Sequence, residues 1–283
     1  MQDYWEYQGK ICVVTGASSG MGKATTEMLV DLGAEVYAIA RRDVKVDGLA
    51  GSIHADISDR ASIDAAFQRI PGSIDAFFGV AGTTGHSCDY ITTYATNFLS
   101  NQYMAERYLK ERIAENGSIT FVTSSAGLRW ENPIHQQDYL PVVQANDWDK
   151  AVQLLLDRGC NSLHGKLAYA PSKKALNYYA TLLATELGCR HIRVNAVLPG
   201  STDTGMTADF VSSLGSVEKL ITYGGLANRL ATPQEMAAPI VFLGSQMASY
   251  ISGICLVADY ALEAQISLGQ RPDPNLPMQS SAR

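Results

Sequence analysis

Short apolar runs alternate with longer segments of helical periodicity along almost the whole chain. The strand-like runs occupy residues 10–16, 35–40, 52–56, 74–82, 118–125, 192–200 and 255–259, and helical patterns lie near 20–32, 59–70, 92–114, 169–188 and 233–247. Several runs are nearly continuous in apolar residues, which is typical of strands covered on both faces. The alternation predicts an α/β fold, a parallel sheet with helices on both faces. Because no linker or repeat interrupts it, we expect one domain over residues 1–269, with an insertion at about 128–165.

The composition narrows the class of protein. Hydrophobic residues make up 46% of the 283 residues and charged residues 18%, which predicts a soluble protein with a sizeable core. The net charge is -6 and the longest basic run is only Arg41-Arg42, so no nucleic-acid partner is expected. The sequence has no uncharged apolar stretch of about 18 residues and no apolar N-terminal segment of the signal-peptide type, so no membrane partner is expected.

The remaining compositional signals concern cysteine, histidine and proline. Five scattered cysteines without a paired spacing favour reduced thiols in a cytoplasmic protein. The five histidines lack the spacing of metal ligands, so no metal site is predicted. Residues 270–283 are rich in proline and offer little to bury, which predicts a flexible C-terminal tail.

The first strand leads directly into the glycine-rich segment TGASSGMG. Gly16, Gly20 and Gly22 lie there between a strand and a helix. Glycine lets the backbone approach a pyrophosphate closely, and the N-terminus of the helix offers free N–H groups to it. The spacing is a variant of the dinucleotide fingerprint in the structural context that the fingerprint requires. A tight turn without a ligand is the alternative interpretation.

The end of the second strand bears on which dinucleotide binds. Ala40 stands where an acidic residue would bind the ribose 2′-hydroxyl of NAD, and Arg41 and Arg42 follow it. Guanidinium groups suit a 2′-phosphate, so we expect NADP(H) rather than NAD(H). Two solvated arginines beside Asp43 are the alternative, which leaves NAD(H) possible.

A tyrosine and a lysine four residues apart suggest acid/base chemistry. Tyr169 and Lys173 would share one helix face, and a nearby ammonium lowers the pKa of a tyrosine from its usual value of about 10. Such a pair exchanges a proton with an alcohol or a carbonyl. Ser124 and Ser125 end the strand SITFVTSS, at the sheet edge where ligands bind in open α/β folds. Asn97, in the helix after the fourth strand, could hold Lys173 or a water chain.

Taken together, these motifs resemble the short-chain dehydrogenase/reductase family over about residues 8–262. The resemblance rests on TGASSGMG, VAG (80–82), Asn97, VTSSAG (122–127), YAPSK (169–173), LPGSTDT (198–204) and NRLATPQEMA (228–237). It implies a Rossmann-like, doubly wound, seven-stranded parallel sheet in a single domain. It also implies hydride transfer between a nicotinamide and an alcohol or carbonyl carbon.

The resemblance implies a role for each matching residue. Tyr169 would be the acid/base, Lys173 would lower its pKa and bind the nicotinamide ribose, and Ser124 would orient the substrate oxygen, with Ser125 as the fallback. Asn97 would complete the proton relay. The implied cofactor contacts are Gly16, Ser18, Ser19, Gly20, Met21, Gly22, Arg41, Arg42, Asp56, Ile57, Ala81, Gly82, Tyr169, Lys173, Pro199, Gly200, Thr202 and Thr204.

The sequence departs from the family pattern in two places. Gly79 and Val80 replace the asparagines of the usual Asn-Asn-Ala-Gly, which puts the support of the central strand in doubt. The segment DYA (259–261) replaces the usual Asp-Gly-Gly, which puts the C-terminal turn in doubt. Neither change removes a chemical group.

The insertion lies between Ser124 and Tyr169, which are 45 positions apart instead of about a dozen. Within it, NDWDKAVQLLLDRG predicts a helix that begins after Asn146 or Asp147 and ends at Gly159, and that serves as a lid or as a flap that modifies an interface. Some hydroxysteroid dehydrogenase/carbonyl reductases resemble this chain in carrying a similar insertion. The predicted substrate contacts are Ser124, Tyr169, Trp130, Met206 and Phe210, with a wider apolar flap that includes Tyr139, Leu140, Trp148 and Leu155.

Two apolar segments beside the site favour a bulky apolar alcohol or ketone, such as a hydroxysteroid. The alternatives are a reductase of small carbonyl compounds and a non-catalytic sensor that binds NADP. A serine hydrolase is disfavoured because no G-x-S-x-G motif is present. Apolar residues at helical spacing also form ordinary cores, which would leave the substrate open. The resemblance further implies a homodimer or homotetramer.

Overall fold

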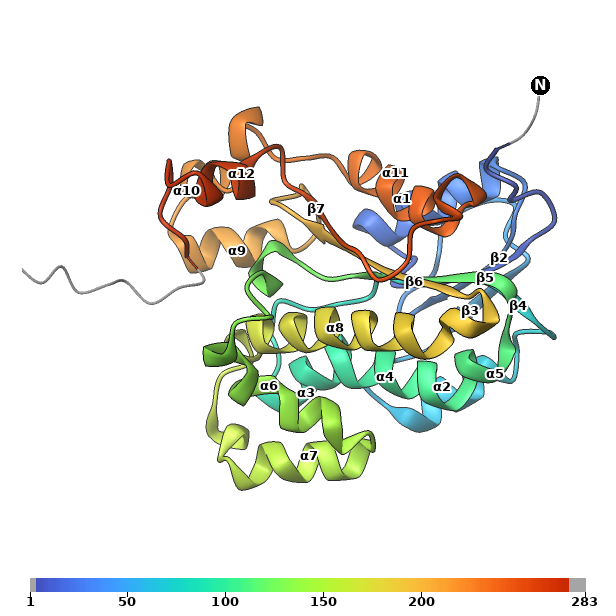
Figure 1. Cartoon of the computed structure of the whole chain (residues 1–283), viewed down its shortest axis with the longest axis horizontal. Coiled ribbons are helices and arrows are strands. Elements are labelled where there is room, and N and C mark those ends of the chain that lie inside the picture. Colours follow the sequence, from blue (N-terminus) through green and yellow to red (C-terminus); the bar gives the residue numbers. More distant parts are fainter. Residues whose placement is uncertain (1–3, 275–283) are drawn as a thin grey trace, which may run out of the picture.

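The computed structural model describes residues 4–274 and contains a seven-stranded sheet in which every strand pair is parallel (Figure 1). The strands are β1 (Ile11–Thr15), β2 (Glu35–Ala40), β3 (Gly51–His54), β4 (Ile74–Gly79), β5 (Ile113–Val122), β6 (Arg193–Pro199) and β7 (Cys255–Ala258). Their spatial order is β3-β2-β1-β4-β5-β6-β7. The prediction of a single-domain, Rossmann-like, doubly wound fold is confirmed.

Helices cover both faces of the sheet (Figure 1). One face carries α1 (Gly20–Asp31) and α11 (Pro233–Gly244), and the other carries α2 (Arg60–Phe67), α8 (Lys166–Leu187) and a long helical segment over residues 90–112. That segment comprises α3 (Tyr90–Tyr94), α4 (Ser100–Met104) and α5 (Lys110–Arg112), joined by π-helical turns at Ala95–Leu99 and Ala105–Leu109. Each helical segment predicted outside the insertion is present.

Two apolar cores lie on opposite faces of the sheet. Neighbouring residues of β4 enter different cores, because successive strand side chains point to opposite faces. Phe77 packs with Phe98 and Phe121 on the α8 side, while Phe78 packs with Leu29 on the α1 side. All five side chains are fully buried, and burial stabilises the fold by about 1.5–3 kcal/mol for each such side chain. The sheet edge that carries the site therefore stands on a rigid scaffold.

The insertion folds into the helical hairpin α6 (Pro133–Ala145) and α7 (Trp148–Asp157). The predicted helix is α7: the Asp147 carboxylate accepts a hydrogen bond from Lys150 N at 2.9 Å, and Gly159 follows the helix with a φ of 73°. Asn146 instead ends α6 in the left-handed conformation. The helix α6 was not predicted, and proline at an interior position such as Pro141 normally disfavours a helix.

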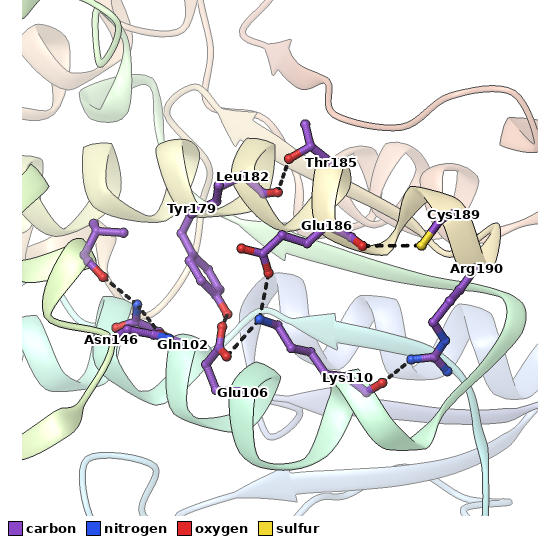
Figure 2. Close-up of polar contacts among 11 residues, drawn as sticks. Gln102, Glu106, Lys110, Asn146, Tyr179, Leu182, Thr185, Glu186, Cys189 and Arg190 are labelled. Carbon is purple, nitrogen blue, oxygen red and sulfur yellow. Dashed lines mark hydrogen bonds and ion pairs between the residues drawn. The ribbon is translucent and has the colours of Figure 1, made fainter.

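The hairpin packs on the outer surface of the helical layer and not over the carboxyl edge of the sheet (Figure 1). The Gln102 side chain on α4 donates a hydrogen bond to Val143 O at 2.9 Å (Figure 2). The Trp148 ring lies edge-on to Tyr103, and Arg60 on α2 forms an ion pair with Asp149 at 2.8 Å. The hairpin is therefore tied to α2 and α4.

This position overturns part of the predicted apolar flap. Tyr139 and Leu155 are almost fully buried within the core that the hairpin shares with α3 and α8, so they cannot form a wall that faces a substrate. Apolar residues at helical spacing have here formed a core, which was the alternative interpretation. The lid interpretation of the α7 segment is likewise unsupported by its place in the fold.

Three short helices gather at one end of the molecule (Figure 1). They are α9 (Thr207–Leu214), α10 (Val217–Thr222) and α12 (Leu262–Ser267), and each is too short to give a clear periodic signal. Single 3₁₀ turns lie at Ser125–Gly127, Cys160–Ser162, Gly188–Arg190, Gly225–Ala227 and Gln246–Ala248. Within residues 4–274, no helix is long and apolar enough to span a membrane. The five cysteines, all within that range, are unpaired.

The start of the expected C-terminal tail is held against the fold. Arg129 forms ion pairs with Asp273 at 2.6 Å and with Glu263 on α12 at 2.7 Å. The Arg271 guanidinium donates a hydrogen bond to Thr222 O. The described part of the tail is thus anchored, whereas residues 275–283 lie outside the described residues and the prediction about them stays a prediction.

Candidate active site

A cleft runs along the carboxyl edge of the sheet from the end of β2, past the turn after β1, to the segment after β6. It is lined by Gly16, Ser18, Ser19, Gly20, Met21, Gly22, Ile39, Ala40, Arg41, Arg42, Ala55, Asp56, Ile57, Val80, Ala81, Gly82, Thr83, Thr84, Thr96, Thr204, Gly205, Met206 and Asp209. Most residues predicted to contact the cofactor are among them. Five are not, namely Tyr169, Lys173, Pro199, Gly200 and Thr202.

Met206, predicted as a substrate contact, also lines the cleft, and the remaining lining residues were not predicted to contact a ligand. Most of them are neighbours of the motifs, but Thr96 and Asp209 carry no local sequence signal. Among the described residues that line the cleft, none comes from α6 or α7.

The turn after β1 needs glycine at two positions. Gly16 has a φ of 73°, and a Cβ atom there would lie 2.7 Å from Ala81 Cα. A Cβ atom at Gly22 would lie 2.2 Å from Gly16 O. The backbone therefore turns tightly and leaves open the cleft side of the α1 N-terminus, where free N–H groups and the helix dipole favour phosphate. A dinucleotide fits this turn.

Positive side chains surround the far end of the cleft. The Arg42 guanidinium donates a hydrogen bond to Ser19 Oγ at 2.9 Å, which holds it beside the glycine turn. Arg41 lies 3.8 Å from the Asp56 carboxylate; the Arg41 side chain is largely exposed and that of Asp56 is half-buried. A neighbouring hollow is lined by Ser18, Lys23, Arg42, Asp43 and Lys45. Three cations in that hollow favour an anionic ligand group.

Tyr169 lies in the first turn of α8 and faces the end of β5. Burial raises its pKa, while hydrogen bonding with the Ser124 side chain acts in the opposite direction. Ser124 directly follows β5, and its Oγ accepts a hydrogen bond from Ala126 N at 3.1 Å, which fixes the side chain at the sheet edge. The fold thus brings together the two hydroxyl groups that the sequence separates by the insertion.

Lys173 lies one helical turn after Tyr169 and is only 4% exposed. Its Nζ donates a hydrogen bond to Val122 O at 3.1 Å and lies 5.8 Å from the centre of the Tyr169 ring. Burial lowers the pKa of Lys173 to about 8, because a low-dielectric site disfavours the ammonium form. At pH 7 most of these side chains still carry the charge that stabilises a phenolate.

Asn97 lies in the first π-helical turn and is fully buried. Its Oδ1 accepts a hydrogen bond from Thr83 N at 2.8 Å, and its Nδ2 donates to Thr83 O at 3.0 Å and to Ser172 Oγ at 3.2 Å. A Cβ atom at Gly82 would lie 3.2 Å from Asn97 Oδ1 and 3.4 Å from Lys173 Nζ. Asn97 therefore joins the loop after β4 to α8, beside the lysine.

The predicted substrate residues lie in different surroundings. The Phe210 ring on α9 packs edge-to-face on the Tyr169 ring, with centroids 5.7 Å apart. Met206 lines the cleft. Trp130 instead packs edge-to-face on Tyr178 of α8 at 6.1 Å, so its contact with a substrate stays a prediction.

The missing asparagine at Gly79 has a structural replacement. A Cβ atom at Gly79 would lie 2.5 Å from Asn101 Oδ1 and 2.8 Å from the Phe121 ring, so these side chains fill the space. At the next positions, Thr15 Oγ1 accepts hydrogen bonds from Val80 N at 3.1 Å and from the following amide at 3.2 Å. The central strands thus remain supported.

The departure at 259–261 leaves a strained turn. Tyr260 and Ala261 both adopt left-handed backbone conformations, with φ values of 50° and 68°, which glycine would adopt at lower cost. Asp259 compensates in part, since its carboxylate accepts a hydrogen bond from Glu263 N at 2.8 Å at the start of α12.

The fold and the site define the class of protein. A doubly wound parallel sheet, a glycine turn suited to a dinucleotide, and a half-buried tyrosine with a buried lysine beside it are the features of a nicotinamide-dependent oxidoreductase. The short chain dehydrogenase family matches residues 10–139, and the enoyl-(acyl carrier protein) reductase family matches residues 137–261. The chain belongs to the short-chain dehydrogenase/reductase family.

Individual relatives share most of the chain. It is 30% identical to the coniferyl-alcohol dehydrogenase of Pseudomonas sp. strain HR199, covering 89% of this chain and 96% of the relative. It is 29% identical to the 3-oxoacyl-[acyl-carrier-protein] reductase of Thermotoga maritima, covering 90% and 98%. Among solved structures, the 3-alpha-hydroxysteroid dehydrogenase of Pseudomonas sp. B-0831, complexed with NADH, superimposes with a TM-score of 0.74 at 24% identity, over 93% of this chain and all of that one.

Proposed function

We propose that the protein transfers hydride between NADP(H) and a secondary alcohol or ketone, with Tyr169 as the acid/base. The observation that carries this proposal is the grouping of Tyr169, Ser124 and Lys173 at the end of β5, beside the dinucleotide cleft. When bound, the nicotinamide supplies or accepts the hydride.

Each side chain has a distinct task in this scheme. The Tyr169 hydroxyl gives its proton to the carbonyl oxygen during reduction and takes it back during oxidation. The Ser124 hydroxyl donates a hydrogen bond to the same substrate oxygen and holds it in place. The Lys173 ammonium stabilises the phenolate form of the tyrosine. Asn97 holds the loop after β4 against α8, the helix that carries the lysine, through its hydrogen bonds to Thr83 and Ser172.

The preference for NADP(H) is supported by Arg42 and the adjacent hollow, which also contains Lys23 and Lys45. A guanidinium bonded to a phosphate is worth about 1.5–3 kcal/mol. Arg42→Ala should therefore raise the KM for NADP about tenfold or more and leave the KM for NAD within twofold. Arg107→Ala, on the exposed surface of the helical layer, is the matched control. A higher kcat/KM of the unaltered enzyme with NAD than with NADP would refute the preference.

The proposed substrate is a bulky apolar alcohol or ketone, such as a hydroxysteroid. Phe210 and Met206 support it, because they add apolar surface beside Tyr169. A small or aromatic carbonyl compound is the second candidate, and the burial of Tyr139 and Leu155 in the core favours it by removing part of the expected wall.

A substrate panel separates these candidates. It contains hydroxysteroids, coniferyl alcohol, a 3-oxoacyl thioester and small ketones, each assayed with NADP(H) and with NAD(H) by absorbance at the nicotinamide band. Turnover of hydroxysteroids above the others supports the bulky substrate, and turnover of small ketones alone refutes it. Tight cofactor binding without turnover of any compound would favour the non-catalytic sensor.

We also propose a cytoplasmic homodimer, with a homotetramer as the alternative. The hairpin occupies part of the surface formed by α4 and α8, through Gln102 and Val143. The rest of that surface carries a polar network, in which Lys110 forms ion pairs with Glu106 at 2.8 Å and Glu186 at 2.7 Å (Figure 2). Apart from this surface, the edge strand β7 is half-exposed along its length and is available for a second copy. Light scattering should give twice the 30.5 kDa chain mass, and a monomer would refute the proposal.

A further inference from the structure

Few side-chain hydrogen bonds join the helix α9 to the rest of the fold. None of its residues is buried, and it lies between Gly205 and Gly215, the latter with a φ of 92°. Thr207 Oγ1 bonds only within the same segment, to Thr204 N, Thr202 O and Asp203. Within the described chain, Asp209 makes the one side-chain hydrogen bond from α9 to a residue outside residues 202–216. Asp209 therefore supplies the side-chain hydrogen bond that anchors α9 to another part of the described fold.

The partner of Asp209 is Thr84, in the loop after β4. The Thr84 hydroxyl donates to Asp209 Oδ2 at 2.6 Å, a length typical of a charge-assisted O–H···O⁻ bond. Thr84 is only 7% exposed, and its Oγ1 also accepts a hydrogen bond from His86 N at 3.2 Å. Both Thr84 and Asp209 line the cleft. The bond thus joins the two walls of the cleft, one after β4 and one after β6.

The residue next to Asp209 contacts the proposed acid/base. Phe210 packs its ring edge-to-face on Tyr169 at 5.7 Å. Because the two residues are adjacent on one short helix, any movement of α9 away from Thr84 would also move Phe210 away from Tyr169. The bond between Thr84 and Asp209 and the contact between the two rings are therefore made or lost together.

We propose that Asp209 and Thr84 are positioning residues that hold α9 closed beside Tyr169, so that Phe210 forms one wall of the substrate site. The inference rests on the proposed function of Tyr169. Without the bond, α9 would sample open positions, and the apparent affinity for substrate would fall by the fraction of molecules in which the wall is in place. A hydrogen bond to a charged group of this kind corresponds to about a tenfold effect or more.

The test uses the full chain with its cofactor and the best alcohol or ketone from the panel. The variants are Asp209→Ala, Thr84→Val, the double variant and the conservative Thr84→Ser. Ser213→Ala is the control, because Ser213 Oγ donates a hydrogen bond only to Asp209 O, within α9. We expect KM for the alcohol or ketone to rise about tenfold in both single variants with kcat within threefold. The double variant should be no worse than either single one, because both remove the same bond. Thr84→Ser and Ser213→Ala should stay within twofold of the unaltered enzyme.

Hydrogen exchange provides a readout that is independent of activity. Amides of residues 205–215 should exchange faster in Asp209→Ala and Thr84→Val, while those of β4 and β5 remain protected, which also shows that the variants fold. Unchanged KM and unchanged exchange over residues 205–215 would overturn the proposal, as would additive losses in the double variant. If those results came with an inactive Tyr169→Phe enzyme, only the positioning role would fail; an active Tyr169→Phe enzyme would refute the proposed function itself.

Discussion

Replacing Lys173 by methionine should separate its electrostatic role from its packing role. The side chain is buried, and its Nζ lies 5.8 Å from the centre of the Tyr169 ring. At an effective dielectric constant of about 20, an ammonium and a phenolate at this distance attract by about 3 kcal/mol, or about two pKa units. Methionine has a similar length and no charge, so the pKa of Tyr169 should rise by about two units in Lys173→Met.

A higher pKa of Tyr169 should slow alcohol oxidation. Alcohol oxidation needs the deprotonated tyrosine, so a pKa two units higher leaves about 100-fold fewer active molecules at pH 7. The pKa of Lys173 is itself lowered to about 8, so the unaltered enzyme begins to lose the ammonium above pH 8. The advantage over Lys173→Met should therefore shrink from about 100-fold at pH 7 to about tenfold at pH 9.

The assay is kcat/KM for alcohol oxidation with saturating NADP between pH 6 and pH 10. Saturation of the cofactor is verified separately by fluorescence titration, because the lysine is also expected to bind the nicotinamide ribose. Lys174→Met is the matched control: Lys174 is 7% exposed, and its charge faces Asp138 and Asp273. A loss below about fivefold in Lys173→Met, an equal loss in Lys174→Met, or a ratio that does not change with pH would show that the charge of Lys173 does not set the pKa of Tyr169.

Three further predictions concern stability and cofactor binding. The pKa of Lys173 is about 8 in the folded protein, against 10.5 for an unperturbed lysine, so between these pH values the unfolded chain binds more protons than the folded one. The free energy of unfolding should therefore rise by up to about 3 kcal/mol from this group as the pH rises from about 8 to 10.5. Lys173→Met should lack this increase in denaturant titrations. Gly22→Ala places a Cβ atom 2.2 Å from Gly16 O and should weaken dinucleotide binding at least about tenfold by fluorescence titration. Ala261→Gly relieves a φ of 68° and should raise the free energy of unfolding by about 0.5–1 kcal/mol; a decrease would show that the turn is unstrained.

The parts of the fold that depend on local sequence were predictable. The strands are nearly continuous apolar runs, and α7 begins at a capping aspartate, Asp147, and is followed by a glycine. By contrast, α6 was not expected, and the Pro141 in its interior has a low helix propensity. Tertiary packing of the buried Tyr139 and Val142 stabilises the helix instead. Local sequence also could not indicate that Trp148 would pack on Tyr103 on the outer side of the helical layer.

The candidate site likewise has residues that the sequence could indicate and residues that it could not. The glycine turn and the Tyr169–Lys173 pair are short-range patterns, and their chemistry could be inferred once the flanking strand and helix and the serines at the end of the strand SITFVTSS were considered with them. Thr84 and Asp209 are 125 positions apart and have no motif, so only the folded chain shows that they meet. The family resemblance helped most where spacing is uninformative, since it associated Ser124 with Tyr169 across the insertion.

The variant Tyr169→Phe tests whether Tyr169 is the acid/base of a nicotinamide-dependent oxidoreductase. The measurement combines single-turnover hydride transfer with a fluorescence titration of NADPH. We expect hydride transfer to fall by at least about 100-fold while the dissociation constant of NADPH stays within threefold, because the variant lacks only the proton donor. Hydride transfer at an unchanged rate in Tyr169→Phe would show that Tyr169 is not the acid/base.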